Sequence, residues 1–396
     1  MLEYASTMTV EESMVFFMLK GNVLYGQSGG PTAVINSSAL GLFLECFKHE
    51  EIEKVYACHY GIEGLLKDDL IDISTISKYK LMQLKNTAGA YFGSCRYQIK
   101  EQKDYDRILE MFKKYNIRYF FYNGGNDSMD TCNKISKFLD SVNYECRVVG
   151  IPKTIDNDLM VTDHTPGFGS ALKYVVTSEI ELIQDIDSYK SGRVTIIEVM
   201  GRNAGWLTAS SLYTQNKTGM PHLIYVPERP FDMDDFLNKV NEIYKKEKKC
   251  VVAVSEGIKD KNNKLISEGN VDAFGHTQLG GVASYLCQVV EEKLKIKTRY
   301  IEMSLLQRCA AHLQSKVDVK EAMDFGKYAL KFALKGETDK MVGIKVISNR
   351  PYRYKYIPIP LSDVANGVKE LDDKYLNKEN GSIKPLYLTY INKFMD

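Results

Sequence analysis

One pattern constrains this chain more than any other: apolar runs of four to seven residues alternate with helical patterns. Residues 119–122 and 148–151 indicate buried parallel strands, and Leu172, Val176, Ile180 and Ile183 have helical spacing. Repeated strand–helix units predict an α/β fold, with mainly parallel sheets and helices on both faces. Turns carrying reactive residues follow the strands at 26–30, 124–128, 152–158, 200–206 and 255–257. Ligands of such sheets bind beyond the carboxyl ends of the strands, so we expect the functional site there.

Composition limits the class of protein. The chain has 396 residues, of which 44% are hydrophobic, enough for a large core in two or three domains. A net charge of +1 gives no indication of nucleic-acid binding, and no apolar run approaches the ~20 residues of a membrane helix. Glu3, Glu11 and Glu12 argue against a secretory signal. The eight cysteines lack CxxC spacing, so we expect buried free thiols and a cytoplasmic protein.

Two glycine turns are candidate phosphate sites. A glycine pair after a strand lets the backbone approach an anion, and a following helix points free N–H groups at it. At Gly29 and Gly30 a plain tight turn has equal weight, because short glycine motifs often occur by chance. In the 124–128 turn, Ser128 is also a good helix N-cap. Asp127 would repel a phosphate there unless a metal or a cation such as Lys153 compensates it.

The turn at 152–158 carries a hydroxyl, a cation and two carboxylates. Thr154, Asp156 and Asp158 are spaced two apart, which puts their side chains on one side of the backbone. One carboxylate can accept the proton of an attacking hydroxyl while the other holds Mg²⁺. The alternative is an Asx turn built on Asp156. With Lys153 alongside, the set fits phosphoryl transfer.

Arginines are the candidate phosphate clamps, although a lone arginine commonly forms a surface ion pair. Arg202 stands out, because it follows a buried strand between two glycines and should face the ligand crevice. The others are Arg96, Arg193, Arg299 and Arg308, of which the last two could be structural. None of the six histidines has metal-ligand spacing, and His276 is predicted to lie in a loop.

From about residue 22 to about 340 the chain resembles the phosphofructokinase family. The motifs GQSGG, GSCR, GGNDS, PKTIDND, EVMGRNAGW, SEG and TRY…QR occur in family order. The resemblance implies two Rossmann-like domains and transfer of a phosphoryl group to the 1-hydroxyl of fructose 6-phosphate with Mg²⁺, in glycolysis. It places a phosphoryl-donor domain at 1–167 plus about 308–350 and a fructose-6-phosphate domain at 168–307. Residues 351–396 would be a C-terminal segment packing on the core.

The resemblance also assigns roles. Asp156 resembles the general base, with Thr154 and Asp158 beside it. The sugar-phosphate site would comprise Met200, Gly201, Arg202, Glu256 and Arg308. The donor site would comprise Gly29, Arg96, Gly125 and Ser128 with the rest of their turns. Arg193 and Arg299 resemble a pair that reaches in from a neighbouring subunit, which implies a homo-oligomer. No nucleic-acid or membrane partner is expected.

The phosphoryl donor is indicated by two positions. ATP-using members carry small residues where this chain has Asp127 and Lys153, a combination that resembles the pyrophosphate-dependent branch. Asp127 would take the space and charge of the ATP α-phosphate and so exclude the nucleotide. Lys153 would neutralise the leaving phosphate.

Two departures and three alternatives remain at this point. Asn126 replaces the aspartate that family members have at a position associated with Mg²⁺; an amide oxygen can still bind the ion, with Asp158 as a second expected ligand. Leu305 replaces a histidine or tyrosine near the sugar.

The alternatives are an ATP-dependent phosphofructokinase and a non-catalytic regulatory subunit that binds fructose 6-phosphate. A dinucleotide dehydrogenase would need G-x-G-x-x-G, which residues 26–30 do not supply.

Overall fold

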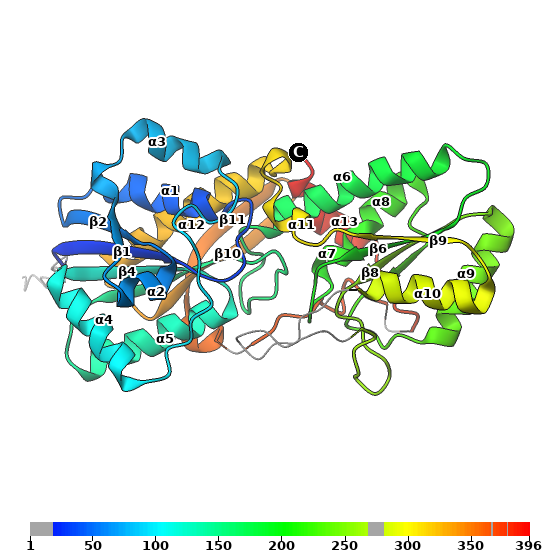
Figure 1. Ribbon diagram of the computed structural model, residues 1–396. Helices are drawn as coiled ribbons and strands as arrows, with labels where there is room; N and C mark the ends of the chain where they lie inside the picture. The colour runs from blue at the N-terminus through cyan, green and yellow to red at the C-terminus, as the bar shows by residue number, and fades with distance from the viewer. Residues whose placement is uncertain (1–18, 268–280, 366, 378) are drawn as a thin grey trace, which may run out of the picture.

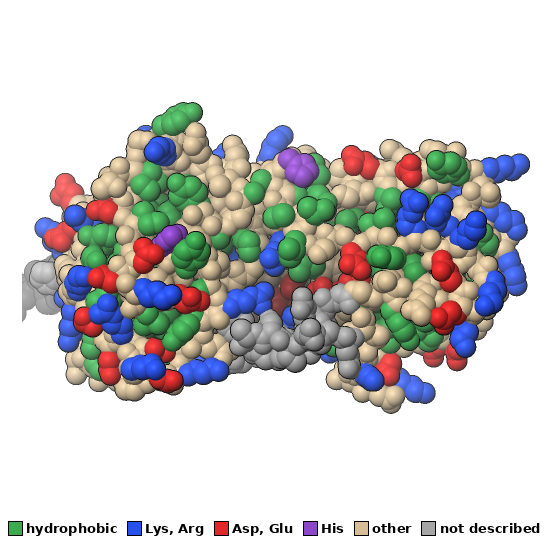
Figure 2. Space-filling model, viewed as in Figure 1, with side chains coloured by type: hydrophobic (Ala, Val, Ile, Leu, Met, Phe, Trp, Pro, Cys, Tyr) green, Lys and Arg blue, Asp and Glu red, His purple; other side chains and the backbone are tan. Residues whose placement is uncertain are grey.

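The computed structural model describes residues 19–267, 281–365, 367–377 and 379–396. The acidic N-terminal stretch and His276 therefore lie outside the described residues. Two lobes stand side by side, each a sheet covered by helices (Figure 1). Basic and acidic side chains are interspersed over both lobes on the face seen in Figure 2, in keeping with a net charge of +1. No helix within the described ranges has the length and apolar character needed to cross a membrane.

The first lobe is built on a seven-stranded sheet in the order β11-β10-β5-β4-β1-β2-β3. Its five inner strands are parallel, and the edge strands β3 and β11 are antiparallel to their neighbours. The strands are β1 (Gly21–Gln27), β2 (Ile52–Cys58), β3 (Leu70–Asp72), β4 (Ile117–Gly124), β5 (Arg147–Pro152), β10 (Lys340–Asn349) and β11 (Tyr352–Pro360).

Both faces of the sheet are buried at its central strands β1, β4 and β5, which is why β4 and β5 contain continuous apolar runs. Tyr119 and Phe121 of β4 face one cluster, and Phe120 and Tyr122 face the other. The first face is covered by α1 (Ile35–Cys46), α3 (Lys78–Gln83) and α12 (Lys316–Leu334), with the 3₁₀ turns η1 (Ile73–Thr75) and η2 (Leu84–Asn86). The second face is covered by α2 (Gly61–Leu66), α4 (Gln102–Lys114) and α5 (Asn126–Ser141).

The second lobe has a four-stranded, fully parallel sheet in the order β7-β8-β6-β9. The strands are β6 (Val194–Val199), β7 (Leu223–Tyr225), β8 (Cys250–Ser255) and β9 (Thr298–Glu302). One face packs on α6 (Phe168–Asp187), α7 (Trp206–Ala209) and α8 (Ser211–Thr218), and the other on α9 (Met233–Glu247) and α10 (Val282–Leu294). The predicted fold class is confirmed: mainly parallel sheets with helices on both faces.

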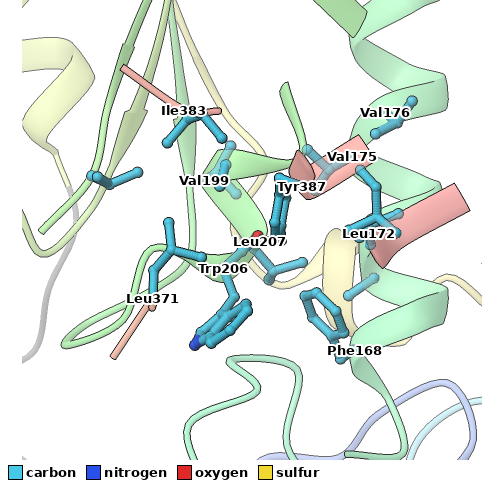
Figure 3. Close-up of a cluster of buried hydrophobic side chains, with 14 of the residues drawn as sticks. Phe168, Leu172, Val175, Val176, Val199, Trp206, Leu207, Leu371, Ile383 and Tyr387 are labelled. Atoms are coloured by element: carbon cyan, nitrogen blue, oxygen red, sulfur yellow. Dashed lines mark hydrogen bonds between the residues drawn. The ribbon is translucent and has the colours of Figure 1, made fainter. Parts of the chain in front are cut away.

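The chain passes from the second lobe back to the first through α11 (Leu306–Cys309) and η3 (Ala311–Leu313). β11 then forms an edge strand of the seven-stranded sheet, although it lies within the predicted C-terminal segment, residues 351–396. The remaining residues form η4 (Leu361–Asp363), α13 (Leu386–Ile391) and η5 (Asn392–Phe394). Leu371, Ile383 and Tyr387 of this segment belong to the same core cluster of the second lobe as Trp206 and Val199 (Figure 3). All eight cysteines are free thiols, and seven of them are buried, as predicted.

Helix α6 begins without a capping side chain of its own, because its N-cap residue is Gly167. Asp318 of α12 takes that place: its carboxylate accepts the N–H of Gly167 at 3.0 Å and the N–H and hydroxyl of Ser170 at 2.9 and 2.6 Å. Asp318 is buried. A carboxylate at a helix N-terminus satisfies unpaired N–H groups and interacts favourably with the helix dipole. This contact therefore joins α12 of one lobe to α6 of the other.

We expect Asp318→Ala to lower the free energy of unfolding by about 2–4 kcal/mol, because it leaves two buried N–H groups without an acceptor. Asp318→Asn keeps one acceptor oxygen and should be destabilised less. Urea denaturation of the three proteins measures the difference. A loss below about 1 kcal/mol in the alanine variant would show that water or a local shift replaces the cap.

Candidate active site

The carboxyl ends of strands from both sheets open on one cavity of about 430 Å³. All five predicted turns contribute to its lining. Those after β1, β4 and β5 come from the first lobe, and those after β6 and β8 from the second. The cavity thus lies where parallel-sheet topology places ligands, between the two lobes.

Most of the predicted site residues meet in this cavity. Those that line it are Gly29, Arg96, Gly125, Asn126, Asp127, Ser128, Lys153, Thr154, Asp156, Asp158, Met200, Arg202, Glu256 and Arg308. Gly201 lies against it, with its N–H donated to Glu256 Oε1 at 3.3 Å. Arg193 and Arg299 are exposed and lie at the amino ends of β6 and β9, away from the cavity of their own chain.

The turn after β4 leads directly into helix α5. The helix begins at Asn126 with Gly125 as its N-cap, so the alternative reading of Ser128 as N-cap is wrong. Ser128 is buried in the first turn, where a Cβ on Gly124 would stand 1.9 Å from its hydroxyl oxygen. Glycine is therefore required at 124. The exposed side chain of Asp127 occupies the helix start, beside N–H groups that have no intrahelical partner.

The turn after β5 is organised by Thr154. Its hydroxyl accepts the N–H of Asp156 at 3.1 Å, and it also hydrogen-bonds the carboxyl group of Asp158. The motif is thus a threonine-headed turn and not an Asx turn on Asp156. Asn157 has a left-handed φ of 54° and donates its amide to the Tyr390 hydroxyl at 3.0 Å. Asp156 and Asp158 consequently both face the cavity.

The two carboxyl groups have unusual electrostatics. Burial raises the pKa of Asp156 to about 8, and the charges of Asp158 and Glu256 act in the same direction. Burial likewise raises the pKa of Asp158, against the Thr154 hydrogen bond. A carboxylate whose pKa lies near neutrality is a stronger base than an ordinary aspartate. Asp156 is therefore suited to accept a proton.

Two cations lie close to the glycine turn after β1. Lys153 Nζ donates to the carbonyl oxygen of Gly30 at 2.7 Å. A Cβ on Gly30 would stand 2.6 Å from Arg308 Nη1, so glycine is what allows the guanidinium to approach. Burial, and then the charge of Arg308, lower the pKa of Lys153 to about 8. Two cationic side chains beside glycine backbone that no side chain covers favour an anion-binding site over a plain turn.

The contacts of Lys153 differ from one sequence expectation. Within the described part of the chain no ion pair joins Lys153 to Asp127. The ammonium instead lies at the Gly30 carbonyl. The charges of Asp156 and Asp158 partly oppose the lowering of its pKa by burial and by Arg308. Asp127 and Lys153 therefore both line the cavity without forming an ion pair with each other.

A divalent cation fits the cavity next to Asn126. The amide nitrogen of Asn126 donates to Asp158 Oδ2 at 3.0 Å, and its amide oxygen Oδ1 is buried without a hydrogen-bond partner. An unsatisfied oxygen beside a carboxylate suits a hard cation. Among the described residues no group of three or more His, Cys, Asp or Glu side chains gathers to bind a metal. A metal here would need further oxygens from a bound phosphate, as Mg²⁺ commonly does.

Sequence reasoning missed part of the lining. Thr32 extends the turn after β1, and Asn203 lies within the recognised turn 200–206 but had been given no role. Gly367 and Val368 come from the C-terminal segment, to which only packing had been assigned. No motif or periodicity marks those two residues. Leu305 is 55% exposed and does not line the cavity. It therefore does not supply the sugar contact expected at its position.

This combination of two mainly parallel sheets, glycine turns, and cations and carboxylates that line one cavity defines an α/β protein built to hold phosphorylated ligands. The family model described as phosphofructokinase matches residues 22–333, and the chain belongs to the phosphofructokinase family.

The relatives narrow this further. The chain is 44% identical to the pyrophosphate–fructose 6-phosphate 1-phosphotransferase of Halomonas elongata, over 92% of this chain and 90% of that protein. It is 44% identical to the enzyme of the same name from Xanthomonas campestris pv. campestris, over 92% and 89%. The crystal structure of a pyrophosphate-dependent phosphofructokinase from Nitrosospira multiformis is similar with a TM-score of 0.86 and 38% identity, covering 95% of this chain and 92% of that one.

Proposed function

We propose that this protein transfers a phosphoryl group from pyrophosphate to the 1-hydroxyl of fructose 6-phosphate, reversibly, in glycolysis. The products are fructose 1,6-bisphosphate and phosphate. The observation that carries the choice of donor is the presence of Asp127 and Lys153 in the lining of one cavity. Asp127 stands at the helix start where a nucleotide would need room for a further phosphate. The names of the similar enzymes agree with this choice.

In this mechanism Asp156 takes the proton of the sugar 1-hydroxyl. A bond forms between that oxygen and the transferred phosphorus as the bridging P–O bond of pyrophosphate breaks. Lys153 stabilises the negative charge left on the departing phosphate. Thr154 holds Asp156 and Asp158 in position through the two contacts of its hydroxyl.

The remaining lining residues divide between the two substrates. Arg202 and Arg308 hold the 6-phosphate, with Met200 and Gly201 shaping that end, and Glu256 accepts sugar hydroxyls. On the donor side, Arg96, Gly29, Gly125 and Ser128 surround the pyrophosphate. We assign the donor to the lobe of residues 1–167 and about 308–350, and the sugar to residues 168–307. Mg²⁺ would be held by Asn126 and Asp158, and when bound it neutralises phosphate charge.

We further propose that the protein is a cytoplasmic homo-oligomer with shared sites. Arg193 precedes β6, while Met200 at the other end of that strand lines the cavity. At about 3.3 Å per residue the strand separates the two by about 20 Å, too far for an arginine side chain. Arg299 lies on β9 opposite Thr195, near the same end of the sheet. Both guanidinium groups are thus free to enter the cavity of a neighbouring subunit.

Mixing two inactive variants tests the shared site. Arg193→Ala and Asp156→Ser should each be nearly inactive alone. If the two variants pair at random into dimers, about half of the dimers are mixed. Each mixed dimer has one intact site of two, so about a quarter of wild-type activity should return. The steady-state rate after co-expression measures this. A fully active monomer in sedimentation would contradict the proposal.

A coupled assay of the full chain tests the function itself. With fructose 6-phosphate and Mg²⁺, turnover should occur with pyrophosphate and not with ATP. Turnover with ATP alone would identify an ATP-dependent phosphofructokinase. Binding of fructose 6-phosphate without turnover on either donor would identify a regulatory subunit.

A further inference from the structure

Residues 367–371 connect loops from both lobes at the edge of the cavity. The N–H of Lys369 donates to the carbonyl of Asp158 at 2.7 Å, and its own carbonyl accepts the indole N–H of Trp206 at 3.0 Å. Glu228 Oε1 accepts the N–H of Leu371 at 2.8 Å and that of Gly205 at 2.7 Å. This segment lies beyond the family match, which ends at residue 333. It joins the turn after β5 to the turn after β6.

The ammonium group of Lys369 is fully used inside the protein. Nζ donates to Asn157 Oδ1 at 3.1 Å, to the Thr162 carbonyl at 2.9 Å and to the Asp163 carbonyl at 2.8 Å. It also lies 5.1 Å from the ring centre of Trp206. An ammonium has three N–H donors, and here each has an acceptor. Lys369 therefore has no donor left for a substrate.

The loop that Lys369 holds contains strained backbone. Asn157 and Val161 have left-handed φ values of 54° and 68°. For a β-branched residue such as valine this conformation is a rare outlier, and it persists only where the surroundings impose it. Asp156 and Asp158, at the start of this loop, both line the cavity. A contact that fixes residues 157–163 thus also fixes the orientation of the two carboxyl groups.

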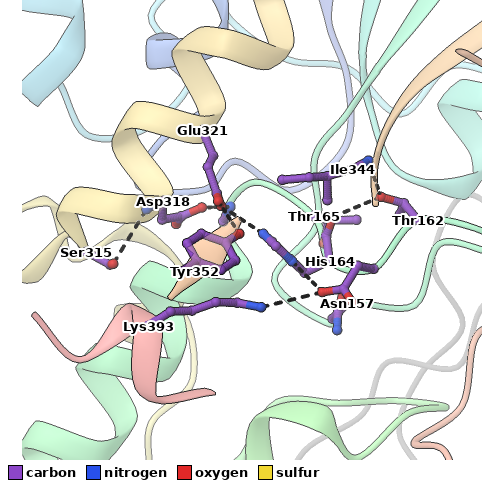
Figure 4. A network of polar contacts seen from close by, with 12 residues as sticks. Asn157, Thr162, His164, Thr165, Ser315, Asp318, Glu321, Ile344, Tyr352 and Lys393 are labelled. Carbon is purple, nitrogen blue, oxygen red and sulfur yellow. Dashed lines mark hydrogen bonds and ion pairs between the residues drawn. The ribbon is translucent and has the colours of Figure 1, made fainter. Parts of the chain in front are cut away.

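The far end of the same loop is anchored by different groups. His164 lies between Asp163 Oδ1 at 2.7 Å and Glu321 Oε2 at 2.8 Å (Figure 4). The Tyr352 hydroxyl also donates to Glu321, and Lys393 Nζ lies 3.5 Å from Asp163 Oδ1. These groups contact side chains at residues 163 and 164. Tyr390 supports the start of the loop as well: its hydroxyl accepts the amide of Asn157 at 3.0 Å and donates to the Asp163 carbonyl at 2.9 Å. Lys369 adds the contacts to the Thr162 carbonyl and, through its backbone N–H, to the Asp158 carbonyl.

We infer that Lys369 is a positioning residue for phosphoryl transfer, whose ammonium clamps the 157–163 loop so that Asp156 meets the sugar hydroxyl. The inference rests on the proposed function. It gives the C-terminal segment a part in turnover. Gly367 and Val368 line the cavity, and Lys369 fixes the 157–163 loop that follows Asp156.

Lys393 provides a matched control. Like Lys369, it is a half-buried lysine of the C-terminal segment that approaches Asp163, and it lies over the Tyr390 ring at 4.5 Å. A purely structural role would make Lys369→Met and Lys393→Met similar in both stability and rate. Positioning predicts that the two differ in turnover at comparable thermal midpoints.

The experiment measures kcat, both KM values and the thermal midpoint of the full chain and the two variants, with pyrophosphate, fructose 6-phosphate and Mg²⁺. A displacement of the base by about 1 Å lowers the rate by about 10²-fold, so this loss in kcat is expected for Lys369→Met. Its KM values should stay close to wild type, and Lys393→Met should keep most of its turnover. Equal losses of kcat in the two variants, or a loss confined to KM, would overturn the inference.

A second pair covers the case in which Lys369→Met does not fold. Lys369→Arg keeps the charge, but a planar guanidinium cannot direct its donors as the ammonium does. Its kcat should fall by about tenfold or more relative to Lys393→Arg, and equal rates would overturn the inference. A wild-type chain without pyrophosphate activity would instead overturn the proposed function, so the two failures are distinguishable.

Discussion

Replacing Asp156 with serine is expected to lower turnover by about 10²–10⁴-fold, the usual contribution of a positioned general base. The serine hydroxyl cannot accept a proton at neutral pH, whereas the carboxylate form of Asp156 can, and its pKa is raised to about 8. Binding of fructose 6-phosphate should hardly change, because the 6-phosphate is assigned to Arg202 and Arg308 and not to Asp156. Steady-state kinetics and calorimetric titration measure the two quantities.

Asp156→Asn is the matched control for shape. It keeps the size of the side chain and its contact with the Thr154 hydroxyl through the backbone N–H, but removes the base. It should lose about as much activity as the serine variant. Retention of more than a tenth of wild-type turnover by Asp156→Ser would exclude Asp156 as the base.

The fold was largely predictable because buried parallel strands have a plain signal. The apolar runs at 119–122 and 148–151 became β4 and β5, and the turns that follow them line the cavity. β11 had a signal of a different kind: Tyr352, Tyr354 and Tyr356 alternate with the exposed Arg353 and Lys355. Its period-2 pattern was concealed by the high content of tyrosine, proline and lysine in that stretch.

Local details of the site depend on tertiary contacts that no motif encodes. A glycine pair followed by Asp127 and Ser128 allows several helix starts, and the structure has Gly125 as the N-cap. Thr154 and Asp156 could each head the turn, and in the structure the Thr154 hydroxyl does so, through its contacts with the N–H of Asp156 and the carboxyl group of Asp158. Gly367 lines the cavity and Lys369 contacts Asp158 because the C-terminal segment packs against loops that are distant from it in sequence. Spacing along the chain carries no information about such a return.

Asp127→Gly is expected to admit ATP as a donor and to weaken the use of pyrophosphate. Removal of the carboxylate leaves space and removes a negative charge at the start of α5, where a nucleotide α-phosphate would lie. The gain with ATP should be modest, since Lys153 still crowds the site. Asp127→Asn, which removes the charge and keeps the bulk, separates the two contributions. An unchanged donor preference in Asp127→Gly, or use of ATP by the wild-type chain, would contradict this account.

Lys153→Met should lower turnover with pyrophosphate by about 10²–10³-fold, because a charge contact formed in the transition state contributes about 3–4 kcal/mol. The methionine fills the same buried space but cannot stabilise the leaving phosphate. Since no ion pair joins Lys153 to Asp127 in the described structure, any coupling between them must act through the bound pyrophosphate. The double variant Asp127→Gly, Lys153→Met tests this: its effects on pyrophosphate turnover should be non-additive, while its effects on the free energy of unfolding should add. Non-additive stabilities would instead place the two side chains in direct interaction in the empty site.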